Sequence, residues 1–282
     1  MHYLIGVSLL WAFSFGLIKG NLAGLDSTAV ATVRLACALL VFLPFFRPQR
    51  ISRRLGLSFA AIGAIQFGVM YVLYLAAYRH LLAYEVALFT VLTPVYVIFL
   101  DGALSGKLAR HAIVATFLAV LGAGILQWRS GISAHGLIGF LLMQGSNLCF
   151  AAGQIAYKRL RAPLAQVGDA SLFGWLYGGA LIATGAVSIL FTDWSAFRPT
   201  GEQWGTMVFL GLLASGLGFF GWNVGATKVS APVLAVFNNV KIPLAVAVSL
   251  LVFNESANLP RLLICGGIMA AAVYVAERPR AT

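Results

Sequence analysis

The amino-acid sequence predicts an all-α polytopic membrane protein with ten transmembrane helices, arranged as two inverted five-helix repeats. Three observations lead to this fold class. The 282 residues are 61% hydrophobic and only 10% charged, whereas a soluble domain has about 25% charged residues. The hydrophobic residues form continuous runs of about 20, the length of a membrane-spanning helix and too long for the alternating strands of a membrane β-barrel. The two halves of the chain also resemble each other.

Ten hydrophobic runs bounded by Pro, Gly or charged residues define the predicted helices. In chain order they are 3–22, 28–46, 56–78, 83–101, 111–128, 137–158, 169–191, 205–226, 231–252 and 259–276. We expect a first module over 1–128, a connecting loop over 129–136 and a second module over 137–282. Ten spans use about 200 residues, so the remaining residues are too few for a soluble catalytic domain. The first run has no basic segment before it and no cleavage site, which favours a retained helix over a signal peptide.

The distribution of Lys and Arg predicts the orientation of these helices. One set of alternate loops and ends holds twelve cations: Arg47, Arg50, Arg53, Arg54, Lys107, Arg110, Lys158, Arg159, Arg161, Lys228, Arg278 and Arg280. The opposite set holds five: Lys19, Arg79, Arg129, Arg198 and Arg261. Because cytoplasmic loops are enriched in Lys and Arg, both termini are predicted to be cytoplasmic. The net charge of +11 is therefore attributed to membrane orientation, and we expect a lipid environment and no nucleic-acid partner.

An internal repeat with a spacing of 148 residues relates the two halves. Residues 74–89 (YLAAYRHLLAYEVALF) align with 222–237 (WNVGATKVSAPVLAVF), and Gly68 aligns with Gly216. The alternative is a chance similarity between hydrophobic sequences. A repeat of five spans crosses the membrane an odd number of times, so the second copy must be inverted. Inverted repeats are typical of secondary transporters, whose substrate sites lie near the bilayer midplane between the copies.

Four segments carry a family resemblance: WAFSFGLIKG (11–20), TVRLACALL (32–40), VLTPVYVIFL (91–100) and FNESANLPRLLICGGIMAAAVYV (253–275). Together they resemble the EamA branch of the drug/metabolite transporter superfamily. The first module departs from the pattern, because Gly106 and not an acidic residue lies opposite Glu255. The resemblance implies a ten-helix transporter that exports small organic metabolites across an inner membrane. Among the branches it favours amino acid exporters, including the aromatic amino acid type, without naming the substrate.

Lys241 is the deepest predicted charge. It lies ten residues inside the helix 231–252, about 15 Å of helical rise from its start and so near the midplane. A cation there costs about 2.5–3.5 kcal/mol and normally faces a wet cavity. We interpret Lys241 as a counter-ion for a substrate carboxylate, with the amides of Asn238 and Asn239 beside it. The alternative is a structural lysine that extends to the interface or pairs with a buried acid.

Pro94 and Pro243 occupy equivalent places in the two modules, with one further residue of offset. Each proline removes a backbone hydrogen bond and frees a carbonyl one turn earlier. In a bilayer such groups are tolerated where neighbours or a cavity satisfy them. We expect two symmetric hinges that line the transport path; simple curvature of the helices is the alternative.

Aromatic and amide side chains are the remaining candidates for the substrate site. Tyr71, Tyr74 and Tyr78 share one helical face, and Trp222 stands at the position of Tyr74 in the second module. Asn147 lies midway along the helix 137–158. A phenol or indole inside the membrane needs a hydrogen-bond partner, and a cavity for an amphipathic substrate would provide one. Core packing and, for Tyr78, the interfacial aromatic belt are the alternatives.

Arg34 and Glu85 are predicted near the outer ends of their helices, where structural contacts are the favoured role. The alternative role of the two residues is in gating or in binding a substrate ammonium group. The sequence contains no motif for a nucleotide, metal or other cofactor, so none is expected. GxxxG pairs at Gly174–Gly178 and Gly221–Gly225 indicate close helix packing within a monomer. The competing function, a membrane enzyme acting on lipid-linked substrates, would need convergent acids or histidines that the loops lack.

Overall fold

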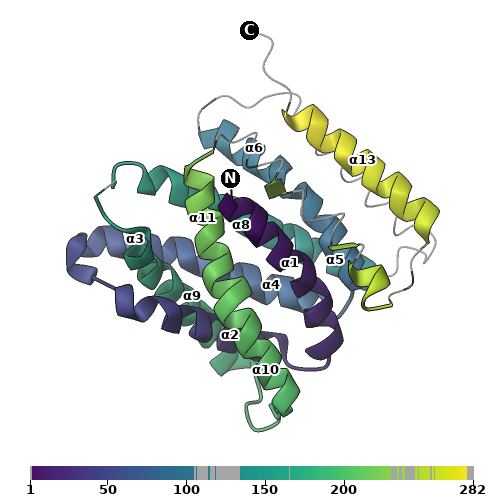
Figure 1. Ribbon diagram of the computed structural model, residues 1–282, viewed down its shortest axis with the longest axis horizontal. Helices are drawn as coiled ribbons and strands as arrows, with labels where there is room; N and C mark the ends of the chain where they lie inside the picture. The colour runs from purple at the N-terminus through teal and green to yellow at the C-terminus, as the bar shows by residue number, and fades with distance from the viewer. Residues whose placement is uncertain are drawn as a thin grey trace.

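The computed structural model is built from helices (Figure 1). It describes residues 2–104, 134–164, 166–229, 248–254 and 258–277, with residues 106, 114, 118, 234, 237, 238, 245, 246 and 256. In the first half the helices are α1 (His2–Asn21), α2 (Ser27–Phe42), α3 (Arg53–Gly63), α4 (Met70–Ala77), α5 (Ala83–Phe89) and α6 (Thr93–Leu104). In the second half they are α8 (Ala134–Arg161), α9 (Asp169–Phe191), α10 (Gly201–Phe209), α11 (Gly218–Thr227) and α13 (Leu259–Glu277).

Eight of the ten predicted helices are present at nearly the predicted bounds; the 169–191 helix is α9 itself. The second helix ends earlier than predicted, because α2 passes into a 3-10 turn (Leu43–Phe45) that contains Pro44. The third begins earlier, at Arg53, because the Ser52 hydroxyl caps its first turn by accepting a hydrogen bond from the Leu55 N–H (3.3 Å). The predicted helices 111–128 and 231–252 lie mostly outside the described residues. Seven helical segments in the described ranges are long and hydrophobic enough to cross a membrane, so the count of ten stays a prediction.

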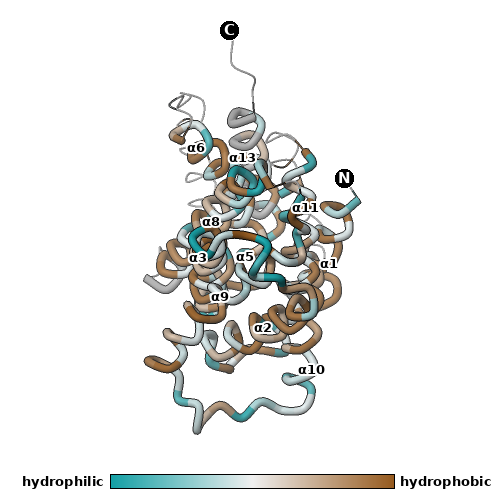
Figure 2. The backbone as a smooth tube through the Cα atoms, turned by 90° about the vertical axis from the view of Figure 1, so that its left-hand side faces the viewer, coloured by the Kyte–Doolittle hydropathy of each residue, from teal (hydrophilic) through white to brown (hydrophobic). Residues whose placement is uncertain are grey.

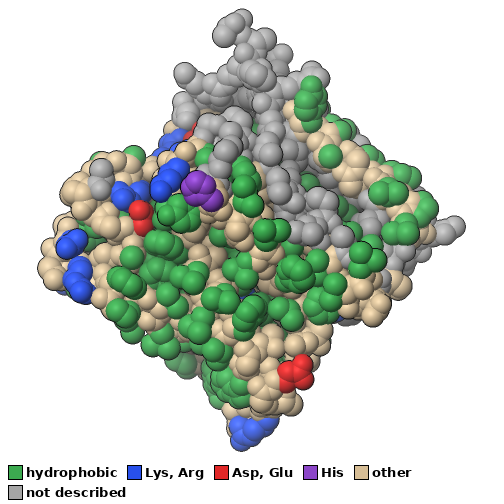
Figure 3. Space-filling view, in the orientation of Figure 1, with side chains coloured by type: hydrophobic (Ala, Val, Ile, Leu, Met, Phe, Trp, Pro, Cys, Tyr) green, Lys and Arg blue, Asp and Glu red, His purple; other side chains and the backbone are tan. Residues whose placement is uncertain are grey.

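The surface is that of a membrane protein. Long stretches of the helices are hydrophobic along their length (Figure 2). On the face of Figure 3, hydrophobic side chains cover the middle, and the charged side chains lie at the edges. Large hydrophobic side chains are strongly exposed, among them Ile189 (80%) and Phe191 (77%). A soluble monomer rarely exposes large contiguous hydrophobic surface, so lipid is the natural surrounding of these exposed side chains.

The helices of the two halves interleave. In the first half, α3 packs against α9, and α4 packs against α8; in the second half, α11 packs against α1. The α2 and α9 helices also pack against each other, and α13 lies along α6 (Figure 1). The third span of each half therefore packs on the first two spans of the other half, and the cores of both halves are shared.

One π-helical segment interrupts the third span of each half. One, η3 (Ala64–Val69), separates α3 from α4, and the other, η6 (Leu210–Leu217), separates α10 from α11. A shift of η3 by the repeat spacing, 148, gives 212–217, which lies inside η6. The backbone geometry of both segments differs from that of a regular helix. Single π-helical turns of this kind often occur at functional sites.

Close helix packing occurs at glycine, though not at every position that the GxxxG pairs indicate. A side chain at Gly179 would run into the backbone carbonyl of Ala60, and one at Gly174 would run into the ring of Phe46. The predicted role of Gly178 is wrong, because a Cβ added there meets none of the described atoms within 4 Å. The contact surface of α9 thus includes Gly179 in place of its neighbour.

Candidate functional site: a central cavity between the two halves

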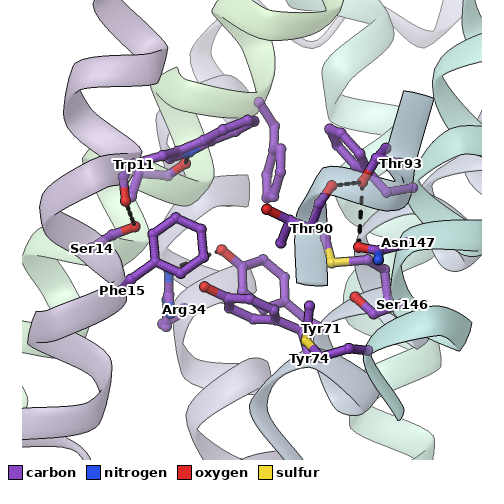
Figure 4. Close-up of a pocket in the computed structure, with 15 residues that line it drawn as sticks. Trp11, Ser14, Phe15, Arg34, Tyr71, Tyr74, Thr90, Thr93, Ser146 and Asn147 are labelled. Atoms are coloured by element: carbon purple, nitrogen blue, oxygen red, sulfur yellow. Dashed lines mark hydrogen bonds between the residues drawn. The ribbon is translucent and has the colours of Figure 1, made fainter. Parts of the chain in front are cut away.

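A cavity lies where helices of the two halves of the chain meet (Figure 4). Its walls come from the central parts of helices in both halves. The lining residues are Trp11, Ser14, Phe15, Arg34, Met70, Tyr71, Tyr74, Thr90, Thr93, Met143, Ser146, Asn147, Phe150, Ala214 and Phe219. The empty space between these side chains, counted to its open mouth, is about 560 Å³.

Arg34 provides a buried positive charge in the wall of this cavity. Its side chain is only 1% exposed, and it lies seven residues after the start of α2, about 10 Å of helical rise. Its Nη2 donates to the hydroxyl oxygens of Tyr71 (2.9 Å) and Ser215 (3.2 Å). The guanidinium carbon also stands 4.8 Å from the centre of the Tyr71 ring, a cation–π contact.

The π-helical segment η6 positions the Ser215 hydroxyl toward Arg34. The Trp11 Nε1–H donates to the Ala214 carbonyl (2.9 Å), and the Tyr177 hydroxyl donates to the carbonyls of Ser215 and Gly216. These three carbonyls are consecutive and lie in the irregular turn. Side chains from α1 and α9 therefore satisfy the backbone groups there and fix the turn against α2.

The opposite wall is formed by the helix break before Pro94. A 3-10 turn, η4 (Thr90–Leu92), separates α5 from α6. Pro94 has no N–H to bond to the Thr90 carbonyl, and the Thr93 hydroxyl donates to that carbonyl instead (2.8 Å). From α8, Asn147 Nδ2 donates to the Phe89 carbonyl (2.9 Å), and Asn147 Oδ1 accepts from the Thr93 hydroxyl (3.3 Å). This polar wall is the kind of satisfied irregular backbone that a cavity permits inside a membrane.

Aromatic rings line the cavity between the two polar walls. Phe15 meets Tyr74 edge-on at 6.3 Å between ring centres, and Phe219 meets Tyr71 edge-on at 5.6 Å. The Tyr74 and Tyr78 hydroxyls share a hydrogen bond of 2.9 Å. Tyr78 lies one turn further along the chain and lines a second cavity, which also contacts the end of α1 and the start of α2.

The predicted substrate residues fall into several groups. Tyr71, Tyr74 and Asn147 line the central cavity, and Tyr78 contacts it through Tyr74. Trp222 lies behind the wall: it is fully buried, packs against Trp11 with tilted rings 5.1 Å apart between centres, and donates from Nε1 to Gln154 Oε1 (3.3 Å).

The other predicted residues lie elsewhere. Glu85 caps α5, where its carboxylate accepts a hydrogen bond from the Leu82 N–H (2.9 Å), and it does not line the cavity. Asn238 is buried and donates from Nδ2 to the Leu234 carbonyl (3.2 Å). Asn239, Lys241 and Pro243 are outside the described residues.

Several cavity residues were absent from the sequence-based site, above all Arg34, Trp11 and Phe15. The signal for Arg34 was a lone charge within the hydrophobic run 28–46; its predicted place near a helix end obscured it. No sequence signal separates Trp11 and Phe15 from residues that face lipid. Among the described residues, no three His, Cys, Asp or Glu side chains come together to hold a metal ion.

Comparison with known proteins gives consistent relatives over nearly the whole chain. Residues 1–128 and 137–276 match the EamA-like transporter family. A Pseudomonas aeruginosa protein named "Probable biotin transporter" is 43% identical over 278 residues, covering 98% of this chain and 96% of its own. Proteins named "Biotin transporter" from Escherichia coli and Salmonella typhimurium are 38% and 37% identical over 279 residues, covering 98% of this chain and 92% of each relative.

A solved crystal structure has a similar backbone. The TM-score is 0.69 at 17% sequence identity, and the match covers 97% of this chain and 95% of the other. At this level of identity the similarity concerns the fold alone. The family and the named relatives are transporters and not enzymes.

Proposed function

Since the chain belongs to the EamA-like transporter family, we propose that it carries biotin, or a closely related organic acid, across the inner membrane by alternating access. The substrate would occupy the central cavity. The single observation that carries the proposal is 37–43% identity, over nearly the full chain, to proteins named as biotin transporters.

The chemistry of the cavity supports such a substrate. Biotin has a carboxylate at the end of a flexible hydrocarbon chain and a fused ring system with a polar ureido group. The cavity has a buried cation on one wall and the polar groups of Thr93 and Asn147 on the other, with aromatic rings between them. A mainly hydrophobic pocket with a few placed polar groups is the usual form of a small-molecule site.

The names of the relatives do not support the expected amino acid substrate. The composition of the cavity also does not favour an amino acid, because the α-ammonium group of an amino acid needs a carboxylate or several carbonyl acceptors. No Asp or Glu is among the residues that line the described cavity. We therefore replace amino acid export with biotin transport as the proposed activity.

The remaining expectations form part of the same proposal. We propose two inverted five-helix modules, which the matching positions of η3 and η6 support. Pro94 and Pro243 would be paired hinges, and the helix break next to Pro94 supports the first. Lys241 and Asn239, with the buried Asn238, would form a second polar group on the transport path, and the monomer would be the functional unit.

Uptake of labelled biotin tests this proposal. The host is a bacterial biotin auxotroph without its own biotin transporter, and it carries either the chain or an empty vector. We expect saturable uptake only with the chain, abolished by excess unlabelled biotin and unaffected by excess amino acids. Uptake equal to the vector control, or inhibition by amino acids alone, would contradict the proposal.

A further inference from the structure

We propose that Arg34, oriented by Tyr71 and Ser215, binds the carboxylate of the transported substrate and gives the cavity its preference for anions. This inference rests on the proposed function for the identity of the substrate. It assigns a specific role to a side chain that is buried in the wall of the central cavity.

The first argument is that the charge of Arg34 is buried without an opposite charge in the described part of the chain. Arginine stays protonated in proteins, and a buried charge is strongly unfavourable unless it is paired. The ion pairs among the described residues join Asp26 to Arg79, Asp101 to Arg159 and Asp169 to Arg161. None of them includes Arg34, so its described partners are neutral hydroxyls.

The second argument is the number of hydrogen-bond donors left unused. A guanidinium group has five N–H donors, and both contacts of Arg34 come from Nη2. Nε and Nη1 are buried and have no hydrogen-bond partner among the described residues. A carboxylate oxygen accepts such a hydrogen bond, and charge assistance makes it stronger than a bond between neutral groups. The unused N–H donors and the unpaired positive charge are therefore both satisfied by one kind of ligand, a carboxylate.

The third argument is that the neighbours hold the guanidinium in place without neutralising it. The Tyr71 and Ser215 hydroxyls bond to each other (2.9 Å) as well as to Nη2. Gly211 in η6 allows close approach to α2, since a Cβ there would lie 3.1 Å from the Arg34 carbonyl oxygen. The site is thus built from α2, α4 and η6 before a ligand arrives, and such preorganisation lowers the entropic cost of binding.

A structural role is the competing explanation: Arg34 could simply join α2, α4 and η6. The two roles differ in one measurable quantity, the ratio of affinities for a carboxylate and for its neutral amide. A structural arginine would change expression or stability but would leave this ratio unchanged. A carboxylate-binding arginine determines the ratio itself.

The experiment measures how biotin and biotin amide compete for labelled biotin uptake in proteoliposomes. The variants are Arg34→Gln, Arg34→Lys and Tyr71→Phe. The control is Arg54→Gln, which removes the same charge from an exposed position. We expect the wild type and Arg54→Gln to prefer biotin over the amide by about tenfold or more, which corresponds to about 1.4 kcal/mol. Arg34→Gln should lose this preference, whereas Arg34→Lys and Tyr71→Phe should reduce it.

An unchanged ratio in Arg34→Gln, in a protein that transports biotin, would overturn the role of Arg34 alone. If that variant does not fold, unchanged ratios in both Arg34→Lys and Tyr71→Phe would overturn it equally. Absence of biotin uptake by the wild type would instead overturn the proposed function, because that result does not depend on any substitution. In that case, binding of an aromatic carboxylate and its amide to the purified wild type and Arg34→Gln decides the role of Arg34.

Discussion

Single side chains provide the polar contacts between the two halves of the molecule. Gln66 in η3 and Asn223 in α11 are both fully buried and exchange two amide hydrogen bonds, of 3.0 and 3.3 Å. The Trp11 indole and the Arg34 guanidinium likewise bond to η6 in the other half. Since a buried polar group without a partner costs about 1–3 kcal/mol, each contact favours one arrangement of the halves over others.

The Gln66–Asn223 pair gives a test at this scale. We expect Gln66→Leu to lower stability by about 1–3 kcal/mol, because it leaves the Asn223 amide buried without a partner. The double variant Gln66→Leu with Asn223→Leu should recover part of the loss, since both polar groups are then absent. Thermal unfolding of the purified variants in detergent measures both effects. Losses that simply add in the double variant would show that the amides do not depend on each other.

Asp26 gives a pH-dependent prediction outside the membrane-spanning segments. Burial raises the pKa of its carboxyl, but hydrogen bonds from the Ala29 N–H and the Thr192 hydroxyl, with the charge of Arg79, outweigh that effect and hold the pKa below its usual value. A lowered pKa stabilises the fold above the pKa of the unfolded chain, about 3.9, and this contribution is lost as the pH falls through the folded pKa.

We therefore expect the wild type to melt at a higher temperature than Asp26→Asn near pH 6. The difference should shrink as the pH falls below about 4, the usual pKa of an aspartate. Melting curves of both proteins across this pH range measure it. A difference that stays constant down to pH 3 would mean that the charge of Asp26 does not stabilise the fold.

The residue scale is also where sequence reasoning was weakest. Tyr71, Tyr74 and Asn147 were predicted as site residues because polar groups inside hydrophobic runs are costly, and all three line the cavity. Arg34 obeys the same rule, but its predicted depth in the membrane depended on where the helix begins. Its place in the site depends on the neighbours that contact it. Those neighbours, Tyr71 and Ser215, are 37 and 181 residues away in sequence, and no local pattern reports such contacts.

Helical elements pack closely where glycines replace side chains, and α9 shows this at adjacent positions. Gly179 approaches the Ala60 backbone of α3, whereas a Cβ at Gly178 would have no described atom within 4 Å. We expect Gly179→Ala to destabilise the protein by about 1–3 kcal/mol, the usual cost of forcing an extra group into a packed core. Gly178→Ala is the matched control and should be neutral or stabilising, because alanine favours a helix over glycine by up to about 1 kcal/mol.

Yield and melting temperature of the two purified glycine variants measure this difference. Equal effects of Gly178→Ala and Gly179→Ala would contradict the packing of α9 on α3. The sequence predicted the bounds of these helices well, because length and hydrophobicity determine a membrane span. It did not distinguish Gly178 from Gly179, since the contact depends on the rotation of α9 about its axis.

At the scale of the whole molecule, the interleaved halves place one cavity at their shared centre. The sequence predicted a midplane site between two repeats, and the described cavity draws its walls from both halves. The identity of the substrate was not predictable in this way. It depends on a few cavity side chains brought together from distant segments, and the proposal of biotin rests on relatives that carry that name.

The orientation of the molecule in the membrane is testable by chemical labelling. In a chain without Cys37, Cys149 and Cys265, we expect Ser130→Cys in the connecting loop to react with an impermeant maleimide added to spheroplasts. The physical reason is the excess of Lys and Arg on the opposite side, which cytoplasmic loops retain. Reaction only after the membrane is opened would contradict both the cytoplasmic termini and the inverted arrangement of the modules.

Transport by the purified protein tests the central claim most directly. Proteoliposomes that contain only this chain are loaded with unlabelled biotin, and the entry of labelled biotin by exchange is followed without any nucleotide. We expect saturable entry that is absent from protein-free liposomes. No biotin exchange, together with exchange of amino acids under the same conditions, would contradict biotin as the substrate and support amino acid transport.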